Sequence, residues 1–160
     1  MRSQVLRTHV SAEPDLTAWL RFLRAHAAVT RELSLRLEAQ HGMSLRDYDV
    51  LVQLYLAPDR RMRRIDIARS VLLSPSGITR LLDGLEGAGW VAKESCASDA
   101  RVTYAVLTQT GLAKFEEAQA THHADIEELF GSRYTAEQRE QLGDLLGRLP
   151  LAETSPTCET

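Results

Sequence analysis

The sequence predicts a mainly α-helical protein with one small β hairpin. Three observations support this fold class: apolar residues recur at helical spacing along most of the chain, four residues stand where they can cap helices, and residues 102–107 alternate as a strand does. The 160 residues suit a single packed unit. The expected order is four helices, the hairpin and two further helices.

Composition narrows the class of protein further. No apolar run approaches the roughly 20 residues of a membrane span, and the N-terminal residues show no apolar stretch typical of a secretion signal. We therefore expect a cytoplasmic protein without a membrane partner. Cys96 and Cys158 lack the spacing of a metal site or a disulfide framework, so neither is predicted.

The first expected helix covers residues 14 to 40, where an apolar stripe follows one helical face, and it ends near Gly42. Ser44 and Asp47 then have the spacing of a capping box, which predicts the start of a second helix. Pro58 ends that helix, because proline cannot continue the backbone hydrogen bonds.

A short third helix is expected at about residues 63–70, with Ile65 and Ala68 facing inward. Ser74 can cap a fourth helix, because its hydroxyl can accept from a free backbone amide, and Pro75 suits the first helical position, which needs no amide hydrogen. The buried face of this fourth helix is expected to hold Ile78, Leu81, Leu82 and Leu85.

Gly87 and Gly89 are expected to end the fourth helix, after which the chain enters the hairpin, whose small and polar tip is residues 95–100. Helix, turn, helix and hairpin is the order of a winged helix-turn-helix. Thr108 can cap a fifth helix, and Thr135 opens a capping box for a sixth.

Charge is distributed unevenly along the chain. The net charge is −3, but residues 60–108 hold eight basic and five acidic side chains, a net charge of +3, which leaves −6 on the remainder. A basic middle between acidic flanks suits a segment that faces the phosphates of a nucleic acid. The alternative is the ordinary unevenness of a solvated surface.

Short motifs in the fourth helix and the hairpin carry a family resemblance. They are Leu-Ser-Pro-Ser at 73–76, Thr-Arg-Leu-Leu at 79–82, Gly-Trp-Val at 89–91, Asp-Ala-Arg at 99–101 and Leu-Thr-x-x-Gly at 107–111. In these motifs the chain resembles the multiple-antibiotic-resistance regulator (MarR) family, and its helix order extends the resemblance over about residues 14–148. The resemblance implies a sequence-specific transcriptional regulator that binds double-stranded DNA. We expect a repressor, and an activator is the alternative.

The resemblance also implies a homodimer whose terminal helices intertwine, so that two winged lobes bind the halves of a near-palindromic operator. The first, fifth and sixth helices carry more apolar surface than one small lobe can cover, which supports a dimer independently. We expect a helical dimerisation region at 1–42 and 109–149, a winged helix-turn-helix lobe at 43–108, and a disordered tail at 150–160.

The residues expected to contact DNA follow from this arrangement. At the start and on the outward side of the fourth helix these are Ser74, Ser76, Gly77, Thr79 and Arg80. Arg80 is the candidate for reading a base, because a guanidinium can hydrogen-bond to O6 and N7 of guanine together. Contact with phosphate alone is the alternative for Arg80.

Basic residues outside the fourth helix form the second expected part of the interface. The resemblance implies that Arg101 enters the minor groove and that Asp99 orients it, since a narrow A·T-rich groove attracts an arginine. Lys93 is expected to contact phosphate. Arg63 and Arg64 belong to a basic run at 60–64 that either meets phosphates or forms a solvated loop.

A small-molecule effector is a further expectation from the resemblance, since members of the family bind small, often aromatic acids between the dimerisation helices and the winged lobe. The residues that could line such a pocket are Trp19, Leu23, His26, Tyr48 and Val52. Aromatic rings with polar tips suit a ligand of this kind. The alternative is that these residues are ordinary core.

Two other classes of protein stay open. Cys96 at the hairpin tip could make the chain a thiol redox-responsive regulator, although no cluster of basic residues predicts a low thiol pKa there. A winged helix that binds proteins in place of DNA is the second. We predict no enzyme, cofactor or metal site: no nucleophile with a base or phosphate loop is found, and His122 and His123, being adjacent, point to different faces.

Overall fold

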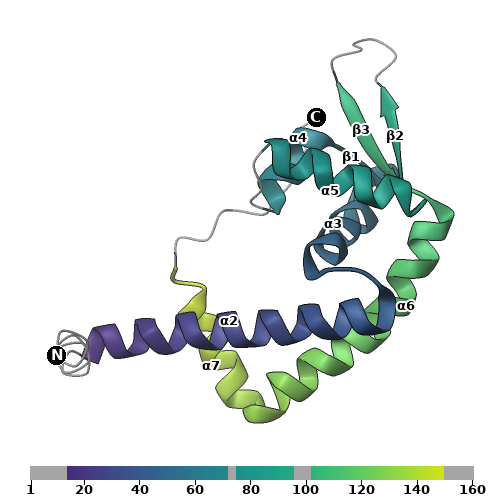
Figure 1. The fold of residues 1–160 in the computed structure, drawn as a ribbon. Coiled ribbons are helices and arrows are strands. Elements are labelled where there is room, and N and C mark those ends of the chain that lie inside the picture. Colours follow the sequence, from purple (N-terminus) through teal and green to yellow (C-terminus); the bar gives the residue numbers. More distant parts are fainter. Residues whose placement is uncertain (1–13, 72–74, 96–101, 150–160) are drawn as a thin grey trace, which may run out of the picture.

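The structure is a computed structural model that describes residues 14–71, 75–95 and 102–149. It consists of a helical base and a winged lobe, joined along one side (Figure 1). The helical base contains α2 (Pro14–His41), α6 (Gln109–Leu129) and α7 (Ala136–Leu146). The winged lobe contains α3 (Leu45–Leu56), α4 (Arg64–Ser70), α5 (Pro75–Gly87) and a small sheet. The predicted fold class is confirmed.

The predicted helix starts within the described residues agree with the structure. The hydroxyl of Ser44 accepts from the amide of Asp47 at 3.2 Å, and the carboxylate of Asp47 accepts from the amide of Ser44 at 2.8 Å. Thr135 forms the same reciprocal pair with Gln138 at the start of α7. Each pair satisfies amide groups that the first helical turn leaves without partners. The expected cap at Ser74 lies outside the described residues.

The sheet has three short antiparallel strands in the order β1-β3-β2. The expected hairpin is formed by β2 (Val91–Ser95) and β3 (Thr103–Leu107), while β1 (Arg61–Arg63) pairs with the other edge of β3. The solvated-loop interpretation of residues 60–64 is therefore wrong for β1. A three-residue strand rich in arginine has no apolar alternation by which the sequence could reveal it.

The core lies where α3, α4 and α5 meet the sheet and the first half of α6. It includes Leu51, Leu54, Ile67, Ile78, Leu82, Leu85, Val91 and Phe115. Ile65 was expected to face inward, but it is 54% exposed. Ala68 is buried as expected, and Ile67 takes the place of Ile65, because a position two residues before Ile67 lies on the opposite side of a helix.

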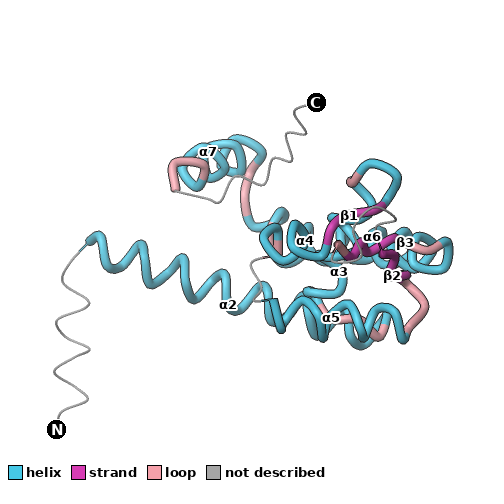
Figure 2. The backbone as a smooth tube through the Cα atoms, turned by 90° about the horizontal axis from the view of Figure 1, so that it is seen from above, coloured by secondary structure: helices cyan, strands magenta, loops and turns pink. Residues whose placement is uncertain are grey.

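The side chains of Arg36 and His41 connect the base helices α2 and α6. Arg36 donates through two nitrogens to both carboxylate oxygens of Glu128, at 2.9 and 3.0 Å, and it also donates to Asp125 at 2.8 Å. His41 Nε2 lies 2.6 Å from the hydroxyl of Thr121. Both contacts involve the C-terminal half of α2, and the N-terminal half extends away from the winged lobe (Figures 1 and 2).

The packing of His122 predicts a dependence of stability on pH. Its ring lies against Tyr48 with centroids 4.5 Å apart, and its Nδ1 has no hydrogen-bond partner among the described residues. Burial and, to a smaller extent, the neighbouring His123 lower the pKa of His122, against a smaller opposing effect of Asp125. The unfolded chain therefore takes up the proton at a higher pH than the folded chain does, so the free energy of unfolding falls as the pH drops below about 6.5.

The test is urea unfolding at pH 7.5 and pH 5.5 for the wild type, His122→Gln and His123→Gln. We expect the decrease in stability to be smaller in His122→Gln than in the wild type. His123 is exposed, so His123→Gln serves as the control and should keep most of the decrease. An equal decrease in the wild type and His122→Gln would contradict the prediction.

Candidate nucleic-acid interface

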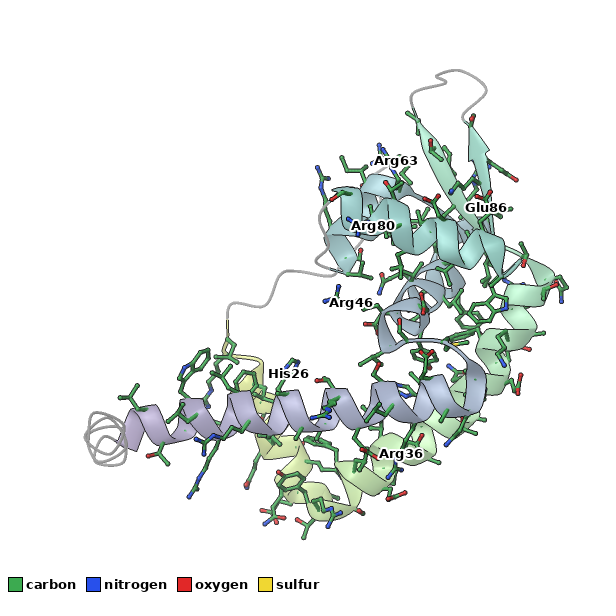
Figure 3. All side chains as sticks on the ribbon, in the orientation of Figure 1. His26, Arg36, Arg46, Arg63, Arg80 and Glu86 are labelled. Atoms are coloured by element: carbon green, nitrogen blue, oxygen red, sulfur yellow. The ribbon has the colours of Figure 1, made fainter. Side chains whose placement is uncertain are left out.

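The helix α5 presents one buried and one exposed face. Ile78, Leu82 and Leu85 are each 1% exposed and anchor α5 on the core, which turns the opposite face to solvent. Ser76 and Arg80 are exposed and Thr79 is half-buried. No ion pair of Arg80 is found among the described residues, and Figure 3 shows its side chain at the outside of the lobe. Arg80 is thus available to a partner.

The start of α4 is tied to α5 by a side-chain hydrogen bond. Arg64 donates to the hydroxyl of Thr79 at 3.1 Å, which brings together two residues that were expected to contact DNA from separate elements. Gly77 lies half-buried in the first turn of α5. The structure therefore collects four of the five expected residues of this helix on one described element, beside Arg64.

The basic run before α4 is ordered by contacts within the lobe. The guanidinium of Arg61 lies 4.2 Å from the centre of the Tyr104 ring and 3.8 Å from the carboxylate of Glu94. Arg63 donates to Asp66 at 2.6 Å. These contacts attach β1 to the hairpin and to α4, so the run is held in place and not free in solution.

Lys93 occupies a different setting from the one expected. It donates to Asp83, and its Nζ lies 2.9 Å from Glu86, both on α5. These hydrogen bonds raise the pKa of Lys93 and keep it charged. Because two carboxylates already neutralise its charge, Lys93 braces β2 against α5 in this arrangement. The sequence offered no signal for this triad, since its members come from a helix and a strand.

Three of the expected DNA contacts lie in the segments outside the described residues. These are Ser74, Asp99 and Arg101, and Cys96 lies outside the described residues too.

Among the residues that the structure does describe, no group of histidine, cysteine and carboxylate side chains is arranged to hold a metal ion. No helix in the same residues is long and apolar enough to cross a membrane.

The five residues expected to line an effector pocket fall into two settings. Trp19 is 53% exposed, and Leu23 and His26 are also exposed, all on the N-terminal half of α2. Tyr48 is 5% exposed and packs on Phe115 and His122, while Val52 is half-buried against the same core. Tyr48 thus belongs to the core of the lobe in this structure.

Comparison with known proteins agrees with this geometry. Residues 41–102 match the model of the MarR family. The transcriptional repressor YetL of Bacillus subtilis is 30% identical over 69% of this chain and 68% of its own length. AbsC, a MarR family regulator of Streptomyces coelicolor, is 30% identical, with a TM-score of 0.76 over 81% of this chain and 87% of that one. Sco3205, a MarR family regulator of the same organism solved in complex with DNA, is 28% identical, with a TM-score of 0.78 over 82% of both chains.

The helix-turn-helix, the exposed face of α5 and the three-stranded wing define a winged helix-turn-helix, DNA-binding regulator. The chain belongs to the MarR family of transcriptional regulators. Proteins of this family regulate transcription and are not enzymes.

Arg80 gives a prediction that separates base reading from phosphate contact. Replacement by alanine is expected to cost about 1 to 3 kcal/mol of DNA-binding free energy and to relax the preference at one base pair. Lysine keeps the charge but loses the planar fork that grips guanine, so Arg80→Lys should also lose the preference. The measurement is a titration at fixed salt against a selected duplex and its single-base variants. An unchanged base preference in Arg80→Ala, with binding weakened equally on every duplex, would leave only a phosphate contact.

Proposed function

We propose that this regulator acts as a homodimer that represses transcription by binding a near-palindromic operator, and that a small aromatic effector changes its affinity for DNA. The observation that carries the proposal is the amount of apolar surface exposed on the helical base, beside a winged lobe whose described residues have a buried core. The large apolar side chains exposed on the described part of this base are Leu16, Trp19, Phe22, Leu23, Leu35, Ile126, Phe130, Tyr134, Leu145 and Leu149.

This apolar surface supports a second copy of the chain as the partner. A monomer rarely leaves a patch of this kind in water, because burying it on association is favourable. The surface includes a row of rings on α2, with Trp19 to Phe22 at 6.1 Å and Phe22 to His26 at 6.3 Å. It also includes a shallow groove on α7 lined by Tyr134, Gln138, Gln141, Leu142 and Leu145.

The proposed dimerisation and DNA-binding regions have the boundaries expected from the sequence, except that the start of α6 belongs to both. Residues 1–42 and 109–149 form the dimerisation region, and residues 43–108 form the winged lobe that binds DNA. The first turns of α6 serve both parts, because Leu112 and Phe115 are buried in the core of the lobe. A dimer of this design suits two recognition helices about 34 Å apart, one turn of DNA.

The proposed DNA contacts are those with support in the structure or the sequence. Arg80, Thr79, Ser76 and Gly77 enter the major groove on α5, Arg63 and Arg64 approach phosphates, and Ser74, Asp99 and Arg101 complete the set outside the described residues. The repressor role is supported by YetL, which is named a transcriptional repressor. A DNA partner also supports the cytoplasmic location expected from the sequence.

The effector proposal rests on the open side of α2. Trp19, Leu23 and His26 offer an apolar wall with one polar tip, which suits an aromatic ligand. Tyr48 and Val52 would join such a site only where the packing of α3 on α6 gives way, because both now belong to that packing.

The homodimer is tested by sedimentation at micromolar concentration, where the expected mass is about twice 17.9 kDa. Leu145→Lys places a charge on the exposed apolar face of α7 and should shift the protein towards the monomer, whereas Glu140→Lys on the same helix should not. A monomeric wild type that binds a palindromic duplex with full affinity would contradict the proposal.

The operator is identified by selection from a random duplex library with the wild-type protein. The expected product is two related half-sites about one helical turn apart, and binding should weaken steeply as salt rises, since phosphate contacts release counterions. Selection of no common sequence, together with binding that is insensitive to salt, would favour a protein-interaction module.

The effector is tested by titrating aromatic carboxylates while recording tryptophan fluorescence and affinity for the selected duplex. Trp19 and Trp90 are the two tryptophans, so quenching that disappears in Trp19→Phe locates the ligand on α2. A ligand that prefers the state unable to bind DNA by about 100-fold shifts the equilibrium by about 2.7 kcal/mol. Unchanged affinity across the panel would contradict this part of the proposal.

A further inference from the structure

The end of α5, which is the proposed recognition helix, is held by several backbone hydrogen bonds. After α5 the chain turns back through Gly89, which has a positive φ of 74° that favours glycine. The amide of Gly89 donates to the carbonyl of Glu86 at 2.9 Å. The amide of Trp90 donates to the carbonyl of Leu85, also at 2.9 Å. The backbone of Trp90 therefore has a set position relative to the last turn of α5.

Thr108 connects this backbone to the start of α6. Its amide donates to the carbonyl of Trp90 at 3.1 Å, and its hydroxyl lies 2.7 Å from the carbonyl oxygen of Gly89, to which it donates. The same hydroxyl accepts from the amide of Gly111 at 2.9 Å, which caps α6. One side chain thus joins the end of α5 to the first turn of α6.

Gly111 brings α6 against the same backbone. A Cβ atom at this position would lie 1.9 Å from the carbonyl oxygen of Trp90, 2.7 Å from its carbonyl carbon and 2.9 Å from its Cα. These are backbone atoms, so they cannot turn aside as a flexible side chain can. Any side chain at Gly111 must move α6 relative to the end of α5.

We propose that Gly89, Trp90, Thr108 and Gly111 form a rigid joint that sets the angle between α5 and α6, and thereby the spacing of the two recognition helices. The inference rests on the proposed homodimer, in which α6 leads from each lobe to the partner. Thr108 and Gly111 are positioning residues in this role: they act through α5 and do not contact DNA.

The spacing of the half-sites is the property that such a joint controls. One turn of DNA is about 34 Å and about 10 base pairs, so one added base pair moves a half-site by about 3.4 Å and rotates it by about 34°. A stiff joint resists that change, and the protein should discriminate strongly between spacings. A loosened joint lets each lobe follow its half-site.

The experiment uses the full chain and the duplex that the wild type selects from a random library, together with the same duplex carrying one base pair more or fewer at its centre. Thr108→Val removes the hydroxyl at nearly constant shape, and Thr108→Ser restores it. Thr110→Val is the matched control, because Thr110 is exposed in the same turn of α6. Gly111→Ala tests the close approach directly.

We expect the wild type, Thr108→Ser and Thr110→Val to prefer the selected spacing by about tenfold, within the usual range for coupled sites. Thr108→Val and Gly111→Ala should lower this ratio to about threefold or less, or move the preference to a neighbouring spacing. Their mass in solution and their affinity for a duplex with a single half-site should match the wild type.

An unchanged spacing ratio in Thr108→Val and Gly111→Ala would overturn the proposed joint. An equal loss of affinity on every spacing would also overturn it, because such a loss indicates only a structural role. If Gly111→Ala does not fold, Thr108→Val decides alone. A monomeric wild type would instead overturn the proposed homodimer, whereas a dimeric wild type without a spacing preference would overturn only the proposed joint, so the two failures are distinguishable.

Discussion

The packing of Phe115 between two tyrosines of α3 is the interaction on which the arrangement of the chain depends. Its ring lies 5.6 Å from that of Tyr48 and 4.8 Å from that of Tyr55, and its side chain is 1% exposed. Burial of such a side chain contributes about 1.5 to 3 kcal/mol, and each aromatic pair about 0.5 to 1.5 kcal/mol more. Because Phe115 belongs to α6, this packing makes one helix a member of both the winged lobe and the helical base.

Several of the basic side chains described in the winged lobe are paired with acidic or aromatic side chains of the same lobe. Arg61, Arg63 and Lys93 each meet a carboxylate or an aromatic ring of the same lobe, so much of the positive charge counted in the sequence is compensated internally. Exposed pairs of this kind are worth little in stability, but they hold side chains in one place. Arg80 on α5 differs from these three, because no ion pair of Arg80 is found among the described residues, which leaves its charge available to a partner.

The sequence predicted the features that depend on neighbours along the chain. The capping box at Ser44, the cap at Thr108 and the proline at the start of α5 are local, since each involves residues within one helical turn. The features that the sequence did not reveal are contacts between distant segments. Strand β1 exists because β3 offers it a free edge, and Lys93 is paired because β2 lies beside α5. Neither neighbour can be read from the local pattern.

The residues expected to bind an effector also show what a local sequence pattern does not predict. A helical stripe predicts that a face is apolar, but it does not say whether a core or a second molecule covers that face. In one protomer Tyr48 is core and Trp19 is open, although both stand on apolar faces in the sequence. Trp19 and Leu23 are therefore accessible both to the partner of the proposed homodimer and to the proposed effector. A ligand that binds there must alter the contact between protomers, and by reciprocal linkage DNA binding must alter the affinity for that ligand.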